Sequence, residues 1–257
     1  MGSQFSQKKP RILCLHGHGA SAKFLENLEM KRWPEFVLEE MDLVYIDAPF
    51  VIDPSRHIEY DPPYYTWYKI EDDQSFEKAV AYIEEQMIKL GPFDGVLGVS
   101  QGGGVTATLP GMQRQGVALT KVPRIKFVII ISGPKLGATT LPCPELAKNA
   151  FSSPLDIPSL HIIGERDKLK EDQFKLLESF VNPTLLYHHE GHGVPHLDDN
   201  GVKMVLGFLK EMRRILFHSR GGRSKMCYYL DLIASLFCFK KNRGIKLTNN
   251  ARVRSLI

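Results

Sequence analysis

Short apolar runs of strand length alternate along the chain with segments that have the spacing of amphipathic helices. The runs are rich in β-branched residues and alternate little with polar residues, which is typical of parallel strands covered on both faces. The predicted strands cover residues 11–15, 43–47, 95–99, 127–132, 160–164 and 185–188. This pattern predicts an α/β fold with a mostly parallel central sheet and helices on both faces.

The clearest helical pattern covers residues 74–90 and ends at Gly91-Pro92. Its apolar residues recur at steps of four, three and four, which places them on one face of a helix. They are Phe76, Val80, Ile83 and Met87. Further helices are predicted from about residue 22 and at 101–114, 171–180 and 201–216.

The connection 50–72 has neither a strand period nor a helical period, yet it is rich in proline, tyrosine and tryptophan. Connections longer than about 12 to 15 residues in compact domains are commonly lids or binding loops, and this aromatic content is untypical of disorder. We interpret the segment as a lid or pocket wall, with a packed surface excursion that binds no ligand as the alternative. Its candidate substrate-binding residues are Tyr64, Tyr65, Trp67 and Tyr68.

Composition agrees with a globular protein, since 43% of the 257 residues are apolar and 24% are charged. No unbroken apolar run is longer than that at 127–131, which is far shorter than the roughly 20 residues of a membrane span. The first 20 residues lack a secretory pattern, and the four cysteines have no zinc or disulfide-framework spacing. We therefore expect a reducing compartment, the cytoplasm, with the nucleus as a further candidate.

The net charge of +4 is unevenly distributed. From Arg213 onward there are 11 Lys and Arg residues and one acid, Asp231, so the preceding part of the chain is mildly acidic. Such a body gives no reason to expect nucleic-acid binding. We divide the chain into a flexible N-terminus (1–9), one α/β domain (10–216) and a basic C-terminal extension (217–257), with the oligomeric state open.

The extension has a hydrophobic centre at 226–239, which is too short to span a membrane. We expect it to be poorly ordered, with weak binding to a membrane surface as the alternative. At the other end, Met1-Gly2-Ser3-Gln4-Phe5-Ser6 matches the pattern for N-myristoylation at Gly2. Lipidation there would give peripheral membrane association, and an ordinary translation start is the competing interpretation.

The sequence Gly98-Val99-Ser100-Gln101-Gly102 follows a predicted strand and begins a predicted helix. A serine at such a sharp turn is exposed above the sheet edge, and small neighbours are required because the turn crowds the backbone. A serine hydroxyl attacks carbonyl carbon only when a base takes its proton and a carboxylate orients that base. Ser100 is therefore the candidate nucleophile.

In this architecture the partners follow the serine in the order acid, histidine, each after a later strand. Asp167 follows the strand 160–164, and His192 follows the strand 185–188, so we predict both as catalytic. Glu165 is the alternative acid, being two residues from Asp167. The alternative histidines are His188, His189 and His196.

A tetrahedral intermediate also requires hydrogen-bond donors for its oxyanion. The expected donors are the N–H of the residue after the serine and one from the loop that follows the first strand. These are Gln101 and His18, the latter within Leu15-His16-Gly17-His18-Gly19-Ala20. The glycines of that loop let its backbone approach a substrate closely.

These motifs resemble the FSH family of small serine hydrolases, which have the α/β-hydrolase fold. The resemblance covers residues 10 to about 215 and is carried by segments in family order: 13–17, 91–102, 131–133, 160–164 with Asp167, and Gly191-His192 before Pro195. It implies a Ser100-Asp167-His192 triad and carboxylesterase or thioesterase activity on acyl esters, without metal or organic cofactor. The family has a bulky residue where His18 stands, and several members have a second glycine or Pro-Gly before the histidine.

We therefore predict a serine hydrolase that cleaves esters or thioesters of small, apolar acyl substrates through an acyl-enzyme. The alternative from another class is a small-molecule receptor on the same scaffold, with slow turnover or none, because a fold does not fix a function. A dehalogenase or peroxidase-like variant is disfavoured, since a dehalogenase would carry Asp at position 100.

Overall fold

The computed structural model describes residues 8–53, 62–70 and 72–219. Within them, six strands form a fully parallel sheet in the order β2-β1-β5-β6-β7-β8. The strands are β1 (Arg11–Leu15), β2 (Asp42–Ile46), β5 (Gly95–Val99), β6 (Phe127–Ile131), β7 (Ser159–Gly164) and β8 (Thr184–His188). All six follow the prediction to within one residue at either end.

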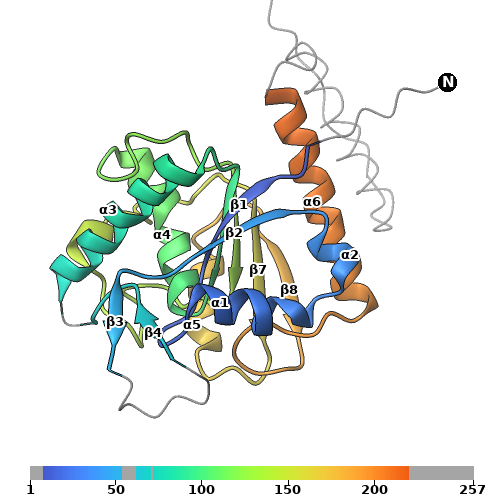
Figure 1. Ribbon diagram of the computed structural model, residues 1–257, viewed down its shortest axis with the longest axis horizontal. Coiled ribbons are helices and arrows are strands. Elements are labelled where there is room, and N and C mark those ends of the chain that lie inside the picture. The colour runs from blue at the N-terminus through green and yellow to red at the C-terminus, as the bar shows by residue number, and fades with distance from the viewer. Residues whose placement is uncertain (1–7, 54–61, 71, 220–257) are drawn as a thin grey trace, which may run out of the picture. The chain divides into compact units, whose positions relative to one another are not determined.

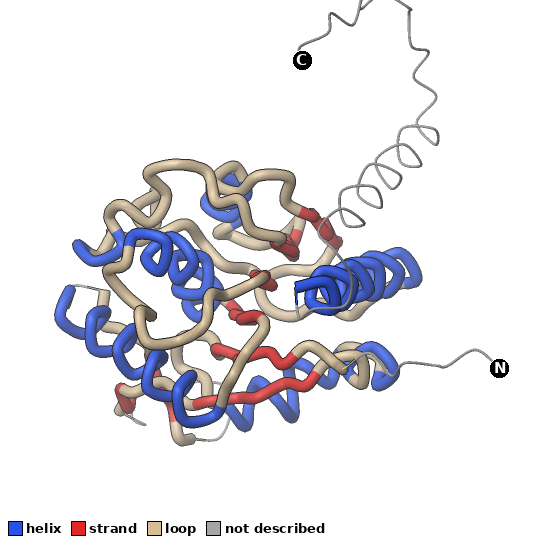
Figure 2. Tube along the Cα trace, turned by 90° about the horizontal axis from the view of Figure 1, so that it is seen from above, coloured by secondary structure: helices blue, strands red, loops and turns tan. Residues whose placement is uncertain are grey.

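Helices cover both faces of this sheet (Figures 1 and 2). They are α1 (Ala22–Phe24), α2 (Glu35–Leu38), α3 (Asp73–Leu90), α4 (Gln101–Gln115), α5 (Lys170–Leu177) and α6 (Asp199–Ser219). The described residues also include three short helical turns. These are the π-helical turn η1 (Leu25–Glu29) and the 3₁₀ turns η2 (Met30–Arg32) and η3 (Glu145–Ala147).

The alternation of side chains along each strand divides the core into two layers. Leu13, Leu15 and Val96 belong to one buried cluster with the apolar faces of α3 and α4. Phe127 lies on the other face and packs edge-on against Phe208 of α6, with ring centroids 5.9 Å apart. Burial on both faces explains why the strands read as continuous apolar runs.

The predicted helix at 74–90 is confirmed as α3, which begins one residue earlier. Asp72 caps it, because its side chain accepts a hydrogen bond from the Ser75 N–H. The helix predicted from residue 22 is short, since α1 gives way to the π-helical turn η1 after three residues. The helix expected at 171–180 ends earlier, at Leu177.

The connection 50–72 contains strands that the sequence analysis did not predict. β3 (Phe50–Ile52) and β4 (Tyr64–Thr66) pair antiparallel as a separate two-stranded sheet. Each strand is only three residues long, too short for a period of two to show in the sequence. Residues 54–61 and 71 of the expected lid lie outside the described residues.

The compact unit that contains the sheet ends at Arg213, inside α6. Among the described helices, none combines the length and the hydrophobicity that a membrane span needs. Gly2, residues 1–7 and all of the basic extension from residue 220 lie outside the described residues.

Helix α4 packs against the sheet at a distance that excludes side chains. A Cβ on Gly102 would lie 2.4 Å from the Leu15 carbonyl oxygen and 2.5 Å from that of His16, and one on Gly98 would lie 2.2 Å from the Gly102 carbonyl oxygen. These neighbours are backbone atoms, which cannot rotate away. Glycine at 98 and 102 therefore permits the turn from β5 into α4.

Gly102→Ala should lower the free energy of unfolding by about 3 kcal/mol, because overpacking against fixed backbone forces the helix away from β1. The matched control is Gly207→Ala in α6, where an added Cβ meets no atom within 4 Å. That change should stabilise the protein by about 0.5–1 kcal/mol through helix propensity. Urea denaturation measures both. Equal effects of the two substitutions would contradict the close approach.

Candidate active site

Ser100 occupies the sharp turn between β5 and α4. Its backbone has φ 53° and ψ −116°, a conformation that non-glycine residues rarely adopt. The Ser100 N–H donates to the Ile131 carbonyl (2.9 Å), and the Ser100 carbonyl accepts from the Gly104 N–H (3.0 Å). The strained residue is thus held by one hydrogen bond to β6 and one to α4.

His192 joins Ser100 to Asp167. Its Nε2 lies 2.7 Å from Ser100 Oγ, and its Nδ1 lies 2.8 Å from Asp167 Oδ2. An ionised carboxylate only accepts hydrogen bonds, so Nδ1 carries the proton and Nε2 is left to accept one from the serine hydroxyl. This is the tautomer that a general base requires.

Asp167 is buried at the carboxyl end of β7. Besides His192, its carboxylate accepts hydrogen bonds from the Leu169 N–H (2.9 Å) and from Gln173 Nε2 (2.7 Å). Burial alone would raise the pKa of Asp167, but the hydrogen bond from His192, with those from Leu169 and Gln173, lowers it to about 2. Asp167 therefore carries a full negative charge at neutral pH.

The competing candidates have other partners. Glu165 is exposed, and its Oε2 lies 2.7 Å from Nδ1 of the exposed His189. His196 is exposed, with Nδ1 3.1 Å from Arg32 Nη2. His188 ends β8, where burial lowers its pKa. Of the acids and histidines that the sequence left open, the structure brings only Asp167 and His192 to Ser100.

The loop that carries His192 is fastened to the end of β6 by Ser132. The Gly193 N–H donates to Ser132 Oγ (3.0 Å), and Ser132 Oγ donates to the Gly193 carbonyl (3.3 Å). Ser132 is fully buried and has a positive φ of 50°. No role for Ser132 was predicted from the sequence, although its place at the end of a predicted apolar strand was an available signal.

The loop after β1 lies directly against the nucleophile. A Cβ on Gly17 would lie 3.4 Å from Ser100 Cβ. Buried His16 holds this loop: its Nδ1 donates to the Gly17 carbonyl (2.7 Å) and its Nε2 accepts from the Ala48 N–H (3.0 Å). Burial lowers the pKa of His16 to about 4, so the ring is neutral and both hydrogen bonds have fixed polarity.

Strand β4 connects this loop to α4. The Gly19 N–H donates to the Tyr65 carbonyl and the Tyr65 N–H donates to the Ala20 carbonyl, both at 2.9 Å. From the other side, Gln101 Oε1 accepts from the Trp67 N–H (2.9 Å) and the Thr66 hydroxyl (3.0 Å). The side chain of the residue after Ser100 thus fixes the strand that holds the loop after β1.

The predicted oxyanion residues, His18 and Gln101, are on the two sides of this arrangement. His18 is exposed, and its Nδ1 lies 3.0 Å from Thr66 Oγ1. Gln101 is buried, and its Nε2 donates to the Tyr68 carbonyl (3.0 Å). The His18 ring and the Gln101 amide group therefore both contact Thr66 of strand β4.

The structure corrects the prediction that Trp67 and Tyr68 line a substrate pocket. Their exposures are 0% and 1%, and both belong to the main hydrophobic cluster. Trp67 Nε1 donates to the His16 carbonyl (2.8 Å), and Tyr68 packs edge-on against Phe76. Tyr64 is also buried. Tyr65 alone of the four is partly exposed, because it points to the opposite face of β4.

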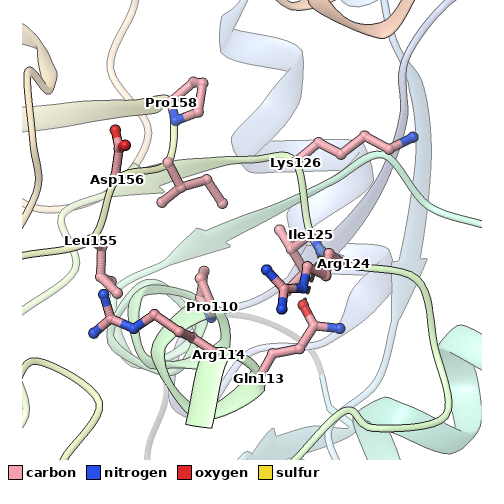
Figure 3. Close-up of a pocket in the computed structure, with 10 residues that line it drawn as sticks. Pro110, Gln113, Arg114, Arg124, Ile125, Lys126, Leu155, Asp156 and Pro158 are labelled. Atoms are coloured by element: carbon pink, nitrogen blue, oxygen red, sulfur yellow. Dashed lines mark hydrogen bonds between the residues drawn. The ribbon is translucent and has the colours of Figure 1, made fainter. Parts of the chain in front are cut away.

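A separate cavity of about 250 Å³ lies at the amino edge of the sheet (Figure 3). Ile125 and Lys126 precede β6 there, and Pro158 precedes β7, whereas Ser100 follows the carboxyl end of β5. Lys126 Nζ is paired with Asp94 Oδ1 at 2.9 Å. This cavity contains no residue of the Ser100 site.

A parallel sheet with a strained serine, a histidine and a buried aspartate at its carboxyl edge defines the class of α/β-hydrolase-fold serine hydrolases. Comparison with known proteins agrees with this class. A family model described as "Serine hydrolase (FSH1)" matches residues 5–204. The chain belongs to this family, and it is therefore a serine hydrolase.

Two curated relatives and one solved structure illustrate the similarity. Esterase CG5412 of Drosophila melanogaster is 26% identical, covering 87% of this chain and 82% of the relative. Esterase OVCA2 of Xenopus tropicalis is 29% identical, covering 72% and 86%. The crystal structure of Zea mays acyl-protein thioesterase 2 covers 81% of this chain and 97% of its own, at 18% identity and a TM-score of 0.50, which shows a shared fold.

Gln101→Ala should release strand β4 from α4 and leave the buried Trp67 N–H without its acceptor. We expect a loss of about 2 kcal/mol in the free energy of unfolding and faster hydrogen exchange at the Trp67 amide. Gln74→Ala, at an exposed position of α3, is the control and should change neither quantity. An unchanged exchange rate at Trp67 in Gln101→Ala would show that the side chain does not hold the strand.

Proposed function

We propose that the protein hydrolyses carboxylic esters or thioesters through a covalent acyl-enzyme on Ser100. The observation that carries this proposal is the continuous hydrogen-bonded line from Ser100 Oγ through His192 to buried Asp167. The family membership and the names of the two esterase relatives support the same reaction class.

In the first half-reaction, Ser100 Oγ attacks the acyl carbon while its proton passes to His192 Nε2. Asp167 is ionised and buried, so it stabilises the imidazolium that forms and keeps the proton on Nδ1 in place. The imidazolium then gives the Nε2 proton to the leaving alcohol or thiol as the bond to the acyl carbon breaks. The product of this step is an ester between the acyl group and Ser100.

The oxyanion of the tetrahedral intermediate needs donors that are already in position. We assign this role to the backbone N–H groups of His18 and Gln101. Gln101 is the first residue of α4, where the N–H has no acceptor within the helix and the helix dipole favours negative charge. His18 follows Gly17, on which a Cβ would lie 3.4 Å from Ser100 Cβ.

In the second half-reaction, water replaces the leaving group. His192, now neutral again, takes a proton from the water as its oxygen attacks the acyl carbon, and then returns that proton to Ser100 Oγ. The carboxylic acid leaves and the free enzyme is restored. No step requires a metal or an organic cofactor.

We propose an apolar acyl group as the substrate, recognised along the outer face of the β3–β4 hairpin. Tyr65 and Val51 are cross-strand partners there, and Val51 is 68% exposed. Tyr65 is bonded through its backbone to Gly19 and Ala20, next to the His18 amide. An acyl chain that leaves the oxyanion site in this direction would cover the aromatic ring.

A fluorophosphonate probe should label Ser100 alone, and Ser100→Ala should abolish both labelling and ester hydrolysis. His192→Ala and Asp167→Asn should each lower kcat by about three orders of magnitude or more, and the double variant should be little worse than either. The matched control for Asp167→Asn is Glu165→Gln, because Glu165 pairs with exposed His189 instead. Mass spectrometry of the labelled peptide and steady-state kinetics measure these effects. Labelling that survives Ser100→Ala would refute the assignment.

Tyr65→Ala should reduce kcat/KM more on long acyl chains than on acetate. Each methylene that loses its contact with the ring weakens binding by about 0.8 kcal/mol, or roughly fourfold. Tyr65→Phe keeps the ring and serves as the control, with chain-length dependence close to that of the wild type. A series of p-nitrophenyl esters and acyl thioesters tests this. An equal loss on short and long chains would place the acyl group elsewhere.

A further inference from the structure

The segment between the loop after β1 and β2 reaches the loop that carries His192. It begins at Ser21, whose hydroxyl accepts from the Phe24 N–H at the start of α1. The helix then widens into the π-helical turn η1, which ends at Glu29, and closes with η2, which ends at Arg32. π-Helical turns inside helices are frequent at functional sites, because the extra residue redirects a side chain.

Glu29 and Arg32 both contact the His192 loop. A Cβ on Gly193 would lie 3.3 Å from Glu29 Oε1, so the carboxyl group lies against the backbone directly after His192. Gly193 has a φ of +103° and is buried. One turn further on, Arg32 Nη2 donates to Glu190 Oε2 at 2.7 Å, before the histidine.

The backbone at Gly193 is therefore held from two directions. Ser132 bonds both its N–H and its carbonyl from the end of β6. Glu29 lies against it from η1, where the Val194 N–H also favours the ionised carboxyl group. Ser132 is uncharged, whereas Glu29 can bring a negative charge to this backbone; Asp167 approaches His192 at Nδ1 instead.

Burial raises the pKa of Glu29 to about 7, while His192, Arg32 and the Val194 N–H act in the opposite direction. Arg32 is paired with Glu190, so of the two positive groups that lower the Glu29 pKa, His192 is the one whose charge changes during the reaction. Below about pH 6 Glu29 is mostly neutral, and above about pH 8 it is mostly ionised. Ionisation of Glu29 is therefore more favourable when His192 is protonated than when His192 is neutral.

We propose that Glu29 is a positioning residue for His192, holding the Gly193–Val194 backbone and adding negative charge beside the imidazolium that forms during acyl transfer. This inference rests on the proposed function for its catalytic part. The coupling between Glu29 and His192 is a property of the folded protein and can be measured without turnover.

The first measurement is a carbon-13 NMR titration of the Glu29 carboxyl group. We expect a midpoint near pH 7, which moves to higher pH in His192→Gln because that change removes the ring whose positive charge lowers the Glu29 pKa. A midpoint near the ordinary value for glutamate, unaffected by His192→Gln, would overturn the proposal.

The second measurement is the pH dependence of kcat for a short p-nitrophenyl ester in the wild type and in Glu29→Gln. Glutamine keeps a hydrogen-bond acceptor of the same shape but carries no charge. The two proteins should have equal kcat at pH 6, and the variant should be about tenfold slower at pH 8.5, which corresponds to one pKa unit of interaction. The control is Glu26→Gln, an exposed position on the same segment, which should match the wild type throughout.

The two measurements separate the possible failures. The proposal would be overturned if the ratio of wild-type kcat to Glu29→Gln kcat were the same at pH 6 and pH 8.5. Glu29 would then have only a structural role. If the NMR coupling is present but no Ser100-dependent hydrolysis is found, the proposed function fails and the catalytic role of Glu29 fails with it. A Glu29→Gln protein that matches the wild type at both pH values would contradict the proposal as well.

Discussion

The turn at Ser100 moves the chain from strand to helix within one residue, and the rest of the site depends on how closely that helix approaches the sheet. Gly98 and Gly102 lie so near to backbone carbonyls that neither could carry a Cβ. The same closeness gives Ser100 its positive φ. The strain is sustained because hydrogen bonds from β6 and α4 and the packing of a buried helix outweigh it.

The remaining parts of the site are brought to Ser100 by loops that leave neighbouring strands at the same edge. These loops are held by buried polar groups and not by apolar packing alone. Neutral His16 fixes the loop after β1, Gln101 fixes β4, and Ser132 fixes the loop after β8. Each group is satisfied, which is what allows polar side chains to remain in the core without a large cost.

The positions of the six strands of the main sheet could be predicted from the sequence, because buried parallel strands read as apolar runs. The proposed nucleophile and its two partners could be predicted as well, because each comes shortly after one of these runs. From the sequence alone, Glu165 remained an alternative to Asp167 as the acid of the triad. The two residues lie on the same turn after a predicted strand, so the sequence pattern does not distinguish them. Burial separates them: Asp167 accepts three hydrogen bonds inside the protein, and Glu165 is exposed.

Other features were beyond the sequence because they depend on contacts between distant segments. The aromatic content of 50–72 indicated a packed segment. It did not indicate that Trp67 faces the core while Tyr65 faces outward. That distinction follows from the pairing of β4 with the loop after β1. Glu29 resembles any charged helical residue in the sequence, and only the π-helical turn places it against the loop of His192.

The most direct test of the central claim is to identify the covalent intermediate. The enzyme would be mixed with p-nitrophenyl butyrate, quenched in acid within milliseconds, digested and analysed by mass spectrometry. A butyryl group on the peptide that contains Ser100, formed at the rate of p-nitrophenol release and absent in His192→Ala, is the predicted result. Rapid ester cleavage with no acyl group on Ser100 at any time, under conditions where deacylation has been slowed by low pH, would contradict the account.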